Sequence, residues 1–279
     1  MEASLIFLAD NGSLEPAATL SLRTIAARLE DALGRKVVPV SLLHSDAVPA
    51  DQLAGQPAEL LVDALVARLQ SGESDFLIVP LFFGPSGALA DALPAQVAAL
   101  KTKFPLLRVR VAPPLVEVDA ANDERMAAIL EENVRTKIAE LSGRPAVILV
   151  DHGSPTRAVT AVREHLARQL RSRLGPTVRD VLAASMERRA GPAYDFNEPL
   201  LERAFDRPGF DAGPGIVAML FLSPGRHAGP AGDIARICAA AEQRHPELRA
   251  MMTDLVGCHP GLIPILVDRV RAGLVSPPI

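Results

Sequence analysis

The sequence predicts an α/β protein built from two similar three-layer α/β/α domains, each with a parallel four-stranded sheet. Two observations support this prediction. Short apolar runs rich in β-branched residues alternate with longer amphipathic stretches, which is the pattern of parallel strands joined by helices. Two motifs also recur in the same order at nearly the same offset, which indicates that a whole domain has been duplicated.

The first repeated motif is an apolar run that ends in an acidic residue and continues with x-Gly-Ser. It occurs as SLIFLADNGSLEP and as AVILVDHGSPTRA, at an offset of 141 residues (Ser13 to Ser154). The second motif occurs as PLFFGPSGALADALP and as MLFLSPGRHAGPAGDI, at an offset of 139 residues (Pro80 to Met219). The shared offset predicts an internal duplication.

Each half contains four predicted strands and four predicted helices in alternation. For the first domain, residues 1–141, the strands are near 4–9, 37–42, 76–83 and 107–112, and the helices are near 16–33, 57–71, 88–103 and 121–141. For the second domain, residues 146–279, the strands are near 146–151, 178–185, 216–222 and 249–254, and the helices are near 156–174, 196–205, 229–244 and 260–273. The segment LSGRPA around Gly143 is the expected hinge.

Three strand ends of the second half carry potential metal or proton ligands. His152 follows the first strand, Glu187 the second and His227 the third. Ligands of parallel α/β sheets bind beyond the carboxyl ends of the strands. Imidazole suits divalent iron, cobalt, nickel and zinc, so we expect His152 and His227, on adjacent strands, to bind one metal ion. Glu187 is expected to be a third ligand or a proton acceptor, and such a site stays open for exchange.

Further residues at these strand ends are candidates for binding a flat, carboxylated ligand. Glycines permit close approach to the backbone, and arginine binds carboxylates in a bidentate manner. Four arginines that would ordinarily be solvated lie near these ends, namely Arg157, Arg188, Arg189 and Arg226. The predicted substrate-binding residues are Gly153, Ser154, Ser223, Gly225, Arg226 and Arg188.

The first half keeps the framework of the motifs but not the histidines. Asn11 and Ala88 occupy the positions of His152 and His227, so we expect this half to be non-catalytic. His44 lies near a strand end, where it could face either the ligand or solvent. Surface or capping positions are expected for His165, within a helix, and for His245, in a turn before Pro246. His259 is expected to cap the last helix, the GCHPG segment with Cys258 to be structural, and Met186 to take part in packing.

Composition limits the classes of function. Apolar residues make up 49% of the 279 residues, charged residues make up 22% and the net charge is −4, which argues against nucleic acid or an anionic membrane as a partner. Two cysteines form no disulfide framework, no basic leader precedes an apolar stretch, and no apolar run approaches about 20 residues. We therefore expect a cytoplasmic protein. Neither an ATP-binding P-loop, a dinucleotide motif nor a G-x-S-x-G hydrolase elbow occurs.

Four segments occur in a characteristic order over residues 146–273: LVDHGSP, SMERRAGP, LFLSPGRHAGPAGDI and LVGCHPGLIPILVDRV. Together they resemble the sirohydrochlorin cobaltochelatase/ferrochelatase family, the class II chelatases. The first half resembles the same frame more weakly, through DNGS and PLFFGPSG. The resemblance implies a tandem chelatase-like fold in which residues 146–279 carry the metal ligands.

The resemblance also implies an activity. Members of this family insert Co²⁺, Fe²⁺ or, in some cases, Ni²⁺ into a tetrapyrrole such as sirohydrochlorin, without ATP, for cobalamin or siroheme biosynthesis. No cofactor is implied beyond the divalent metal substrate. By motif, the metal-binding histidines are His152 and His227, which also help to remove pyrrole protons with the assistance of Glu187.

Two other functions remain open from the sequence. The first is a non-catalytic carrier of a metal or tetrapyrrole, which the missing ligands of the first half would allow. The second is an unrelated α/β hydrolase, which lacks a visible nucleophile motif. The sequence does not select the metal or the tetrapyrrole, and the internal duplication is compatible with a monomer.

Overall fold

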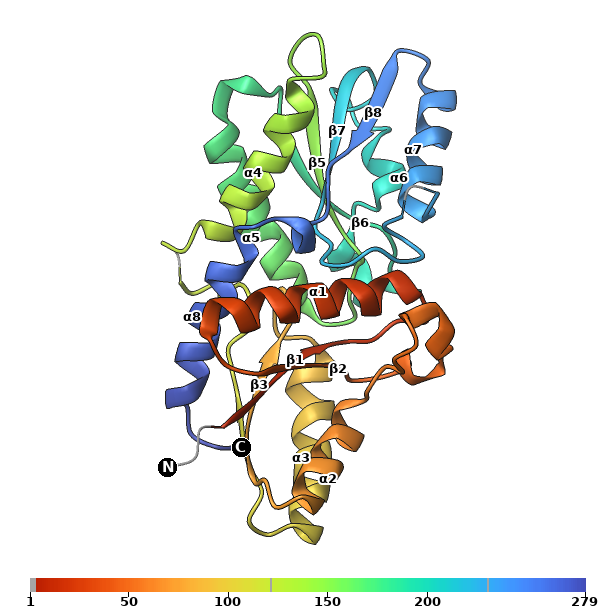
Figure 1. Cartoon of the computed structure of the whole chain (residues 1–279). Coiled ribbons are helices and arrows are strands. Elements are labelled where there is room, and N and C mark those ends of the chain that lie inside the picture. Colours follow the sequence, from red (N-terminus) through yellow and green to blue (C-terminus); the bar gives the residue numbers. More distant parts are fainter. Residues whose placement is uncertain (1–3, 121, 230) are drawn as a thin grey trace. The chain divides into compact units, whose positions relative to one another are not determined.

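The computed structural model describes residues 4–120, 122–229 and 231–279, and it contains two four-stranded sheets whose strands are all parallel (Figure 1). The first sheet has the order β2-β1-β3-β4 and the second has the order β6-β5-β7-β8. The strands are β1 (Leu5–Asp10), β2 (Val37–Ser41), β3 (Asp75–Pro80), β4 (Arg108–Val111), β5 (Ala146–Asp151), β6 (Val181–Ser185), β7 (Gly213–Met219) and β8 (Leu248–Met252). The identical order confirms the predicted fold class and the duplication.

An α-helix follows every strand. The helices are α1 (Pro16–Leu33), α2 (Leu61–Gln70), α3 (Leu93–Lys103), α4 (Arg125–Ile138), α5 (Arg157–Leu174), α6 (Leu201–Ala204), α7 (Asp233–Arg244) and α8 (Leu262–Val275). A π-helical turn, η3 (Ala88–Ala92), leads directly into α3. The helix predicted near 196–205 is shorter than expected: α6 begins only after Pro199, and the 3₁₀ turn η5 (Pro192–Asn197) precedes it.

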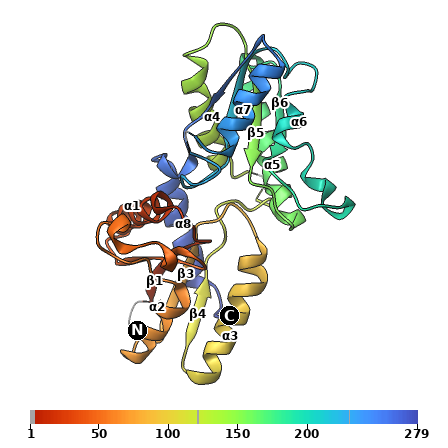
Figure 2. The same cartoon turned by 90° about the vertical axis from the view of Figure 1, so that its right-hand side faces the viewer.

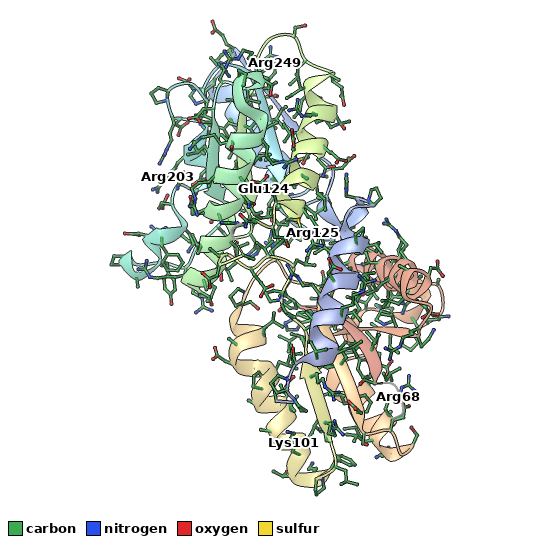
Figure 3. All side chains as sticks on the ribbon, turned by 90° about the vertical axis from the view of Figure 1, so that its left-hand side faces the viewer. Arg68, Lys101, Glu124, Arg125, Arg203 and Arg249 are labelled. Carbon is green, nitrogen blue, oxygen red and sulfur yellow. The ribbon has the colours of Figure 1, made fainter. Side chains whose placement is uncertain are left out.

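Each sheet is covered by apolar side chains, as expected for parallel strands. Every residue of β5 is buried. The helices α2 and α3 share one apolar core cluster with the first sheet (Figure 2). Charged side chains such as Arg68, Arg203 and Arg249 lie on the surface of their units (Figure 3).

The compact units of the structure differ from the halves of the sequence repeat. One unit comprises Met1–Val116 together with Ile263–Ile279, and the other comprises Glu117–Leu262. The helix α4 follows β4 in the chain but packs on α5 and β7 of the second unit. The helix α8 follows β8 but belongs to the first unit, where Gly273 lies against Leu77 of β3.

Each half therefore supplies one helix to the unit formed mainly by the other half. The boundaries 1–141 and 146–279, which we expected for the domains, describe the repeated sequence. The packed units begin and end elsewhere, because the fourth helix of each repeat leaves its own sheet.

Candidate metal and tetrapyrrole site

The imidazole rings of His152 and His227 lie side by side at the carboxyl edge of the second sheet. Their centroids are 4.8 Å apart and their planes are inclined by 65°. The reason is topological: β5 and β7 are hydrogen-bonded neighbours, with Val150 opposite Met219, so their ends meet at one edge. The structure brings together the two histidines that the sequence placed on adjacent strands.

The ring of His227 is oriented by Asp233, the first residue of α7. Oδ2 of Asp233 accepts a hydrogen bond from Nδ1 of His227 at 2.6 Å. Hydrogen bonds from Arg236 and from His227 hold the pKa of the Asp233 carboxyl below its usual value. A carboxylate can only accept hydrogen bonds, so Nδ1 carries a hydrogen, and in the neutral imidazole the lone pair is on Nε2.

The ring of His152 has the same tautomer as that of His227. Its Nδ1 lies 3.1 Å from the carbonyl oxygen of Gly153, which can only accept, so Nδ1 again carries the hydrogen. Its Nε2 lies 3.4 Å from Oε1 of Glu187, and both side chains are about half exposed. Both histidines therefore offer Nε2 to a ligand.

The described residues contain no group of three or more His, Cys, Asp or Glu side chains placed to hold a metal ion together. In this arrangement, Glu187 is close to His152 but does not complete a three-ligand set with both histidines. The geometry is that of an open pair of imidazoles with one carboxylate beside it.

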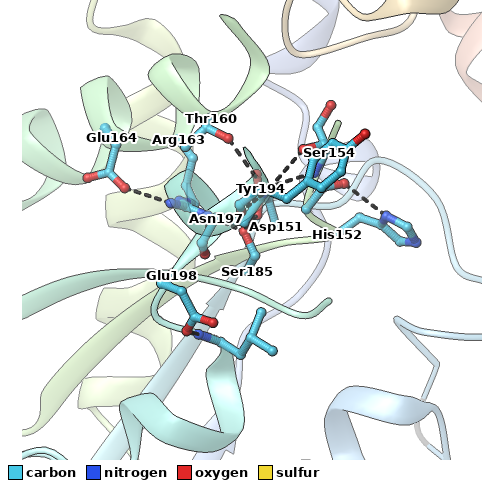
Figure 4. Close-up of polar contacts among 12 residues, drawn as sticks. Asp151, His152, Ser154, Thr160, Arg163, Glu164, Ser185, Tyr194, Asn197 and Glu198 are labelled. Atoms are coloured by element: carbon cyan, nitrogen blue, oxygen red, sulfur yellow. Dashed lines mark hydrogen bonds and ion pairs between the residues drawn. The ribbon is translucent and has the colours of Figure 1, made fainter. Parts of the chain in front are cut away.

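A buried polar network supports the turn that carries His152 (Figure 4). Arg163 of α5 is fully buried, and its guanidinium contacts Asp151 at 3.3 Å and also Ser185. The hydroxyl of Ser185 donates to Asp151 Oδ1 at 2.9 Å. Burial raises the pKa of Asp151, and the positive charge of Arg163 opposes this rise. The network fixes the residue that directly precedes His152.

Asn197 fixes the other side of the same turn. Its Oδ1 accepts a hydrogen bond from the Ser154 backbone N–H at 3.0 Å, and its Nδ2 donates to the Ser154 carbonyl at 2.9 Å. The Ser154 hydroxyl accepts a hydrogen bond from the Thr156 N–H at 3.0 Å. Ser154, which we expected to bind substrate, thus has a structural role in the turn before α5.

Gly153 is needed by the protein's own backbone. Its φ is +93°, and a Cβ atom there would lie 1.9 Å from the carbonyl oxygen of Glu187. The close approach of the neighbouring strand end accounts for this glycine, and the approach of a ligand to it stays a prediction. Gly225 differs, because a Cβ there would meet no atom within 4 Å and so faces open space.

Arg188 is engaged within the chain. Its Nε donates to Glu198 at 2.8 Å, its Nη2 lies 3.3 Å from Asp195, and its Nη1 donates to the Gly191 carbonyl at 3.1 Å. Our assignment of Arg188 as a carboxylate-binding residue does not fit, because these contacts use donors that a ligand would need. Arg226 is 76% exposed; its Nε lies 3.7 Å from Oδ2 of Asp233, which leaves its two Nη groups for a ligand. Ser223 is half-buried.

A cavity of about 410 Å³ adjoins the site and shares Glu187 and Asp233 with it. Arginines also line this cavity, namely Arg226, Arg236 and Arg244. Asp233 was not among the residues predicted for the site. The sequence feature that could have indicated it is an acidic residue at the start of a helix, in Gly-Asp-Ile, six positions after His227.

The corresponding edge of the first sheet keeps Asp10 and Ser41, which match Asp151 and Ser185, but has other residues in place of the histidines, the glutamate and the buried arginine. Gly12, with φ +88°, approaches the Leu43 carbonyl as Gly153 approaches that of Glu187, so Leu43 occupies the position of the glutamate. Leu22 of α1 corresponds to Arg163 at the repeat offset of 141 residues (Leu22 to Arg163). His44 is exposed, with φ 68°.

The other histidines lie outside the pair. His165 is buried in α5, not at the surface or in a cap as we expected, because it lies on the face of the helix that packs in the unit. His245 contacts Asp206 at 2.8 Å, and Nδ1 of His259 accepts from the Gly261 N–H at the start of α8. Met186 is buried, as expected, and Cys258 is exposed and free.

The fold and the paired histidines define a chelatase-like protein. The structure is similar to SirB from Bacillus subtilis with Fe³⁺, with a TM-score of 0.72 and 14% identity over 98% of this chain and 96% of that one. It is also similar to the sirohydrochlorin chelatase SirB from Bacillus subtilis subspecies spizizenii in complex with cobalt, with a TM-score of 0.69 and 14% identity over 96% and 94% of the two chains.

A third similar structure is DR2241 from Deinococcus radiodurans, described as a multi-domain protein with structural similarity to chelatases. The TM-score is 0.60, with 18% identity over 99% of this chain and 57% of that one. The sequence model of the CbiX family matches residues 5–137 and 146–272, and the chain therefore belongs to the CbiX family, in a tandem form. No curated protein matches the chain by sequence. No helix among the described residues has the length and hydrophobicity needed to cross a membrane.

Proposed function

We propose that this protein inserts a divalent metal, Co²⁺ or Fe²⁺, into sirohydrochlorin or a related tetrapyrrole, without ATP, for cobalamin or siroheme biosynthesis. The observation that carries the proposal is the pair of imidazoles, His152 and His227, whose rings lie 4.8 Å apart at an open strand edge. Membership of the CbiX family and the chelatase fold support it.

The two Nε2 atoms hold the incoming metal in this proposal. Neutral imidazole is a suitable ligand for both ions. The Asp233 carboxylate fixes the tautomer and the orientation of the His227 ring, as carboxylate partners do for metal-binding histidines. An open site with few protein ligands lets the metal pass to the macrocycle.

Insertion also requires the loss of protons. A dication replaces two pyrrole N–H protons, so the charge balances when both protons leave the ring. Glu187, 3.4 Å from His152, accepts the first proton, and Nε2 of His152 accepts the second once the metal has left it for the ring; both protons then pass to water. Their half-exposed positions suit this exchange.

The macrocycle would contact the exposed strand-end residues Ser223, Gly225 and Arg226, with Arg226 binding a carboxylate. We propose no cofactor beyond the metal substrate, no nucleic-acid or membrane partner, and a cytoplasmic location. A single chain already contains both repeats, which is compatible with a monomer.

The test is an absorbance assay with purified protein, sirohydrochlorin and Co²⁺. We expect acceleration over the spontaneous rate, and His152→Ala and His227→Ala each to lower kcat/KM by about 100-fold or more. Asn11→Ala, at the matching position of the first half, is the control and should retain full activity. Equal tolerance of all three substitutions would contradict the assignment.

One observation favours a second candidate, a carrier that binds the metal and hands it on. Glu187 does not converge with both histidines in the described structure, which leaves a two-ligand site. The same assay separates the candidates. Metal binding without acceleration of insertion would support the carrier.

A further inference from the structure

Two arginines close in sequence to His152 and Glu187 lie over aromatic rings. The guanidinium carbon of Arg157 is 4.5 Å from the ring centroid of Phe196, and that of Arg189 is 5.8 Å from the ring centroid of Tyr194. Both arginines are exposed, and the two rings are 6.3 Å apart. We call these four residues the arginine–aromatic platform.

The platform is fixed to the turn that carries His152. Both aromatic residues belong to η5, whose last residue is the fully buried Asn197. Asn197 binds the Ser154 backbone through two hydrogen bonds and also donates to the Tyr194 carbonyl at 3.2 Å. Figure 4 shows Tyr194, Asn197 and Ser154 in this network of hydrogen bonds. The rings therefore have a defined position relative to one of the two metal-binding imidazoles.

The guanidinium donors of the platform are free to bind a ligand. Across residues 4–120, 122–229 and 231–279, neither Arg157 nor Arg189 donates a side-chain hydrogen bond or forms an ion pair, whereas Arg188 between Glu187 and Arg189 forms several. A cation above a ring is held electrostatically, without using its N–H groups in bonds to oxygen. An arginine restrained in this way loses less entropy when it forms a bidentate bond with a carboxylate.

The first half of the chain provides an internal comparison. Pro16 occupies the position of Arg157 at the repeat offset, and residues 42–60, between β2 and α2, contain neither arginine nor an aromatic residue. The platform thus occurs only in the half that has the histidines, in a chain with a single tyrosine and no tryptophan. A purely structural role would not explain why it accompanies the histidines.

We propose that Arg157 and Arg189 determine specificity by binding peripheral carboxylates of the macrocycle whose centre lies at His152 and His227. The inference rests on the proposed function for the identity of the ligand, a polycarboxylated tetrapyrrole. The inference assigns carboxylate binding to Arg157 and Arg189, whose donors are free. Arg188, whose donors are engaged within the chain, no longer has this role.

The test uses the full chain and the R157Q/R189Q double variant. The dissociation constant of metal-free sirohydrochlorin is measured by fluorescence titration, the KM and kcat of Co²⁺ insertion by absorbance, and the binding of Co²⁺ alone by calorimetry. We expect the Kd and KM for the tetrapyrrole to rise about fivefold for each arginine and about 20-fold for the pair. The kcat and the Co²⁺ affinity should stay within about twofold, because neither arginine touches the metal ligands.

Three comparisons sharpen the experiment. Arg168→Gln removes an exposed arginine elsewhere on α5 and should change nothing. Phe196→Leu removes one ring while keeping Arg157, and should weaken tetrapyrrole binding by a smaller factor than R157Q. Added salt should reduce the difference between wild type and double variant, because exposed ion pairs are screened.

An unchanged Kd for sirohydrochlorin in the double variant would overturn the inference and leave the proposed function standing. An arginine-dependent Kd in a protein that inserts no metal would support the inference and overturn the proposed function. If the double variant also loses Co²⁺ binding, the same constants are measured for R157K and R189K, which keep the positive charge. A weaker Kd with normal Co²⁺ binding then supports the inference, and a wild-type Kd overturns it.

Discussion

The Asp233 carboxylate accepts a hydrogen bond from Nδ1 of His227 at 2.6 Å, whereas Nδ1 of His152 donates to the Gly153 carbonyl at 3.1 Å. The two imidazoles are therefore inequivalent. Hydrogen bonds to a charged acceptor are shorter and stronger than those to a neutral one. His227 is the more firmly oriented of the two, and His152, next to Glu187, is placed for proton transfer.

This difference predicts the effect of removing Asp233. Asp233→Ala should lower the affinity for Co²⁺ by about 10- to 100-fold, because the ring of His227 loses its orientation and its fixed tautomer. The affinity is measured by titrating the protein with Co²⁺ in the absence of tetrapyrrole.

The chain offers a matched control for this variant. Asp206 contacts Nε2 of His245 at 2.8 Å, and hydrogen bonding with His245 lowers the pKa of Asp206 as well. Asp206→Ala should leave Co²⁺ affinity unchanged. Equal losses in both variants would show that a general effect of charge, not the orientation of His227, controls binding.

Two glycines at the site should respond differently to substitution. Gly153→Ala places a Cβ 1.9 Å from the Glu187 carbonyl oxygen in a left-handed conformation, so we expect a loss of about 3 kcal/mol in the free energy of unfolding. Gly225→Ala meets no atom and should change stability by less than about 0.5 kcal/mol. Urea unfolding measures both, and a stable Gly153→Ala protein would contradict the described backbone.

The fold was predictable because its signals are local and repeated. All eight strands lie where apolar runs were found, and the residues at their ends, including His152 and His227, follow from the same pattern. The groups that each arginine side chain contacts were not predictable from the sequence. Arg188, Arg157 and Arg189 are equivalent by type and position, and only the packed turn shows that Glu198 binds the first and that aromatic rings hold the other two.

The role of Asp233 was not predicted because it depends on the residue at which α7 begins. We predicted a helix near 229–244, and the observed α7 begins at Asp233, which places this carboxylate at the helix start facing His227. The exchange of α4 and α8 between the two units could not be predicted from the sequence either. The last helix of a repeat has the same apolar pattern whichever of the two sheets it covers.

A buried carboxyl group in the first unit should make stability depend on pH. Burial raises the pKa of Asp10, and Leu22 stands where Arg163 accompanies Asp151 in the second unit. Between the unfolded and the folded pKa the native state binds more protons, so stability falls as the pH rises through this interval. Asp10→Asn should therefore be more stable than wild type at pH 7, and this gain should shrink toward pH 4.

Urea unfolding at several pH values tests this prediction. The substitution keeps an oxygen that can accept the Gly12 N–H, which donates to Asp10 at 3.0 Å in the wild type. A stability difference that is the same at pH 4 and pH 7 would show that ionisation of Asp10 does not contribute.

The exchange of helices predicts how the halves behave when separated. In α8, Ile265, Leu266 and Val270 are buried in the first unit, and burial of such side chains contributes about 1.5–3 kcal/mol each. This sum, about 5–9 kcal/mol, approaches the whole stability of a typical domain. A fragment of residues 1–141 lacks α8 and keeps α4, which has no place on its own sheet.

We therefore expect the fragments 1–141 and 142–279 not to fold as monomers, and to recover native structure when they are expressed together. Circular dichroism and urea unfolding report on folding, and sedimentation reports on association. Pairing of fragment 1–141 with itself would agree with the exchange, because α4 of each copy could then cover the sheet of the other. A monomeric fragment 1–141 that unfolds cooperatively would contradict it, since its sheet would have to be stable with the face covered by α8 left open to water.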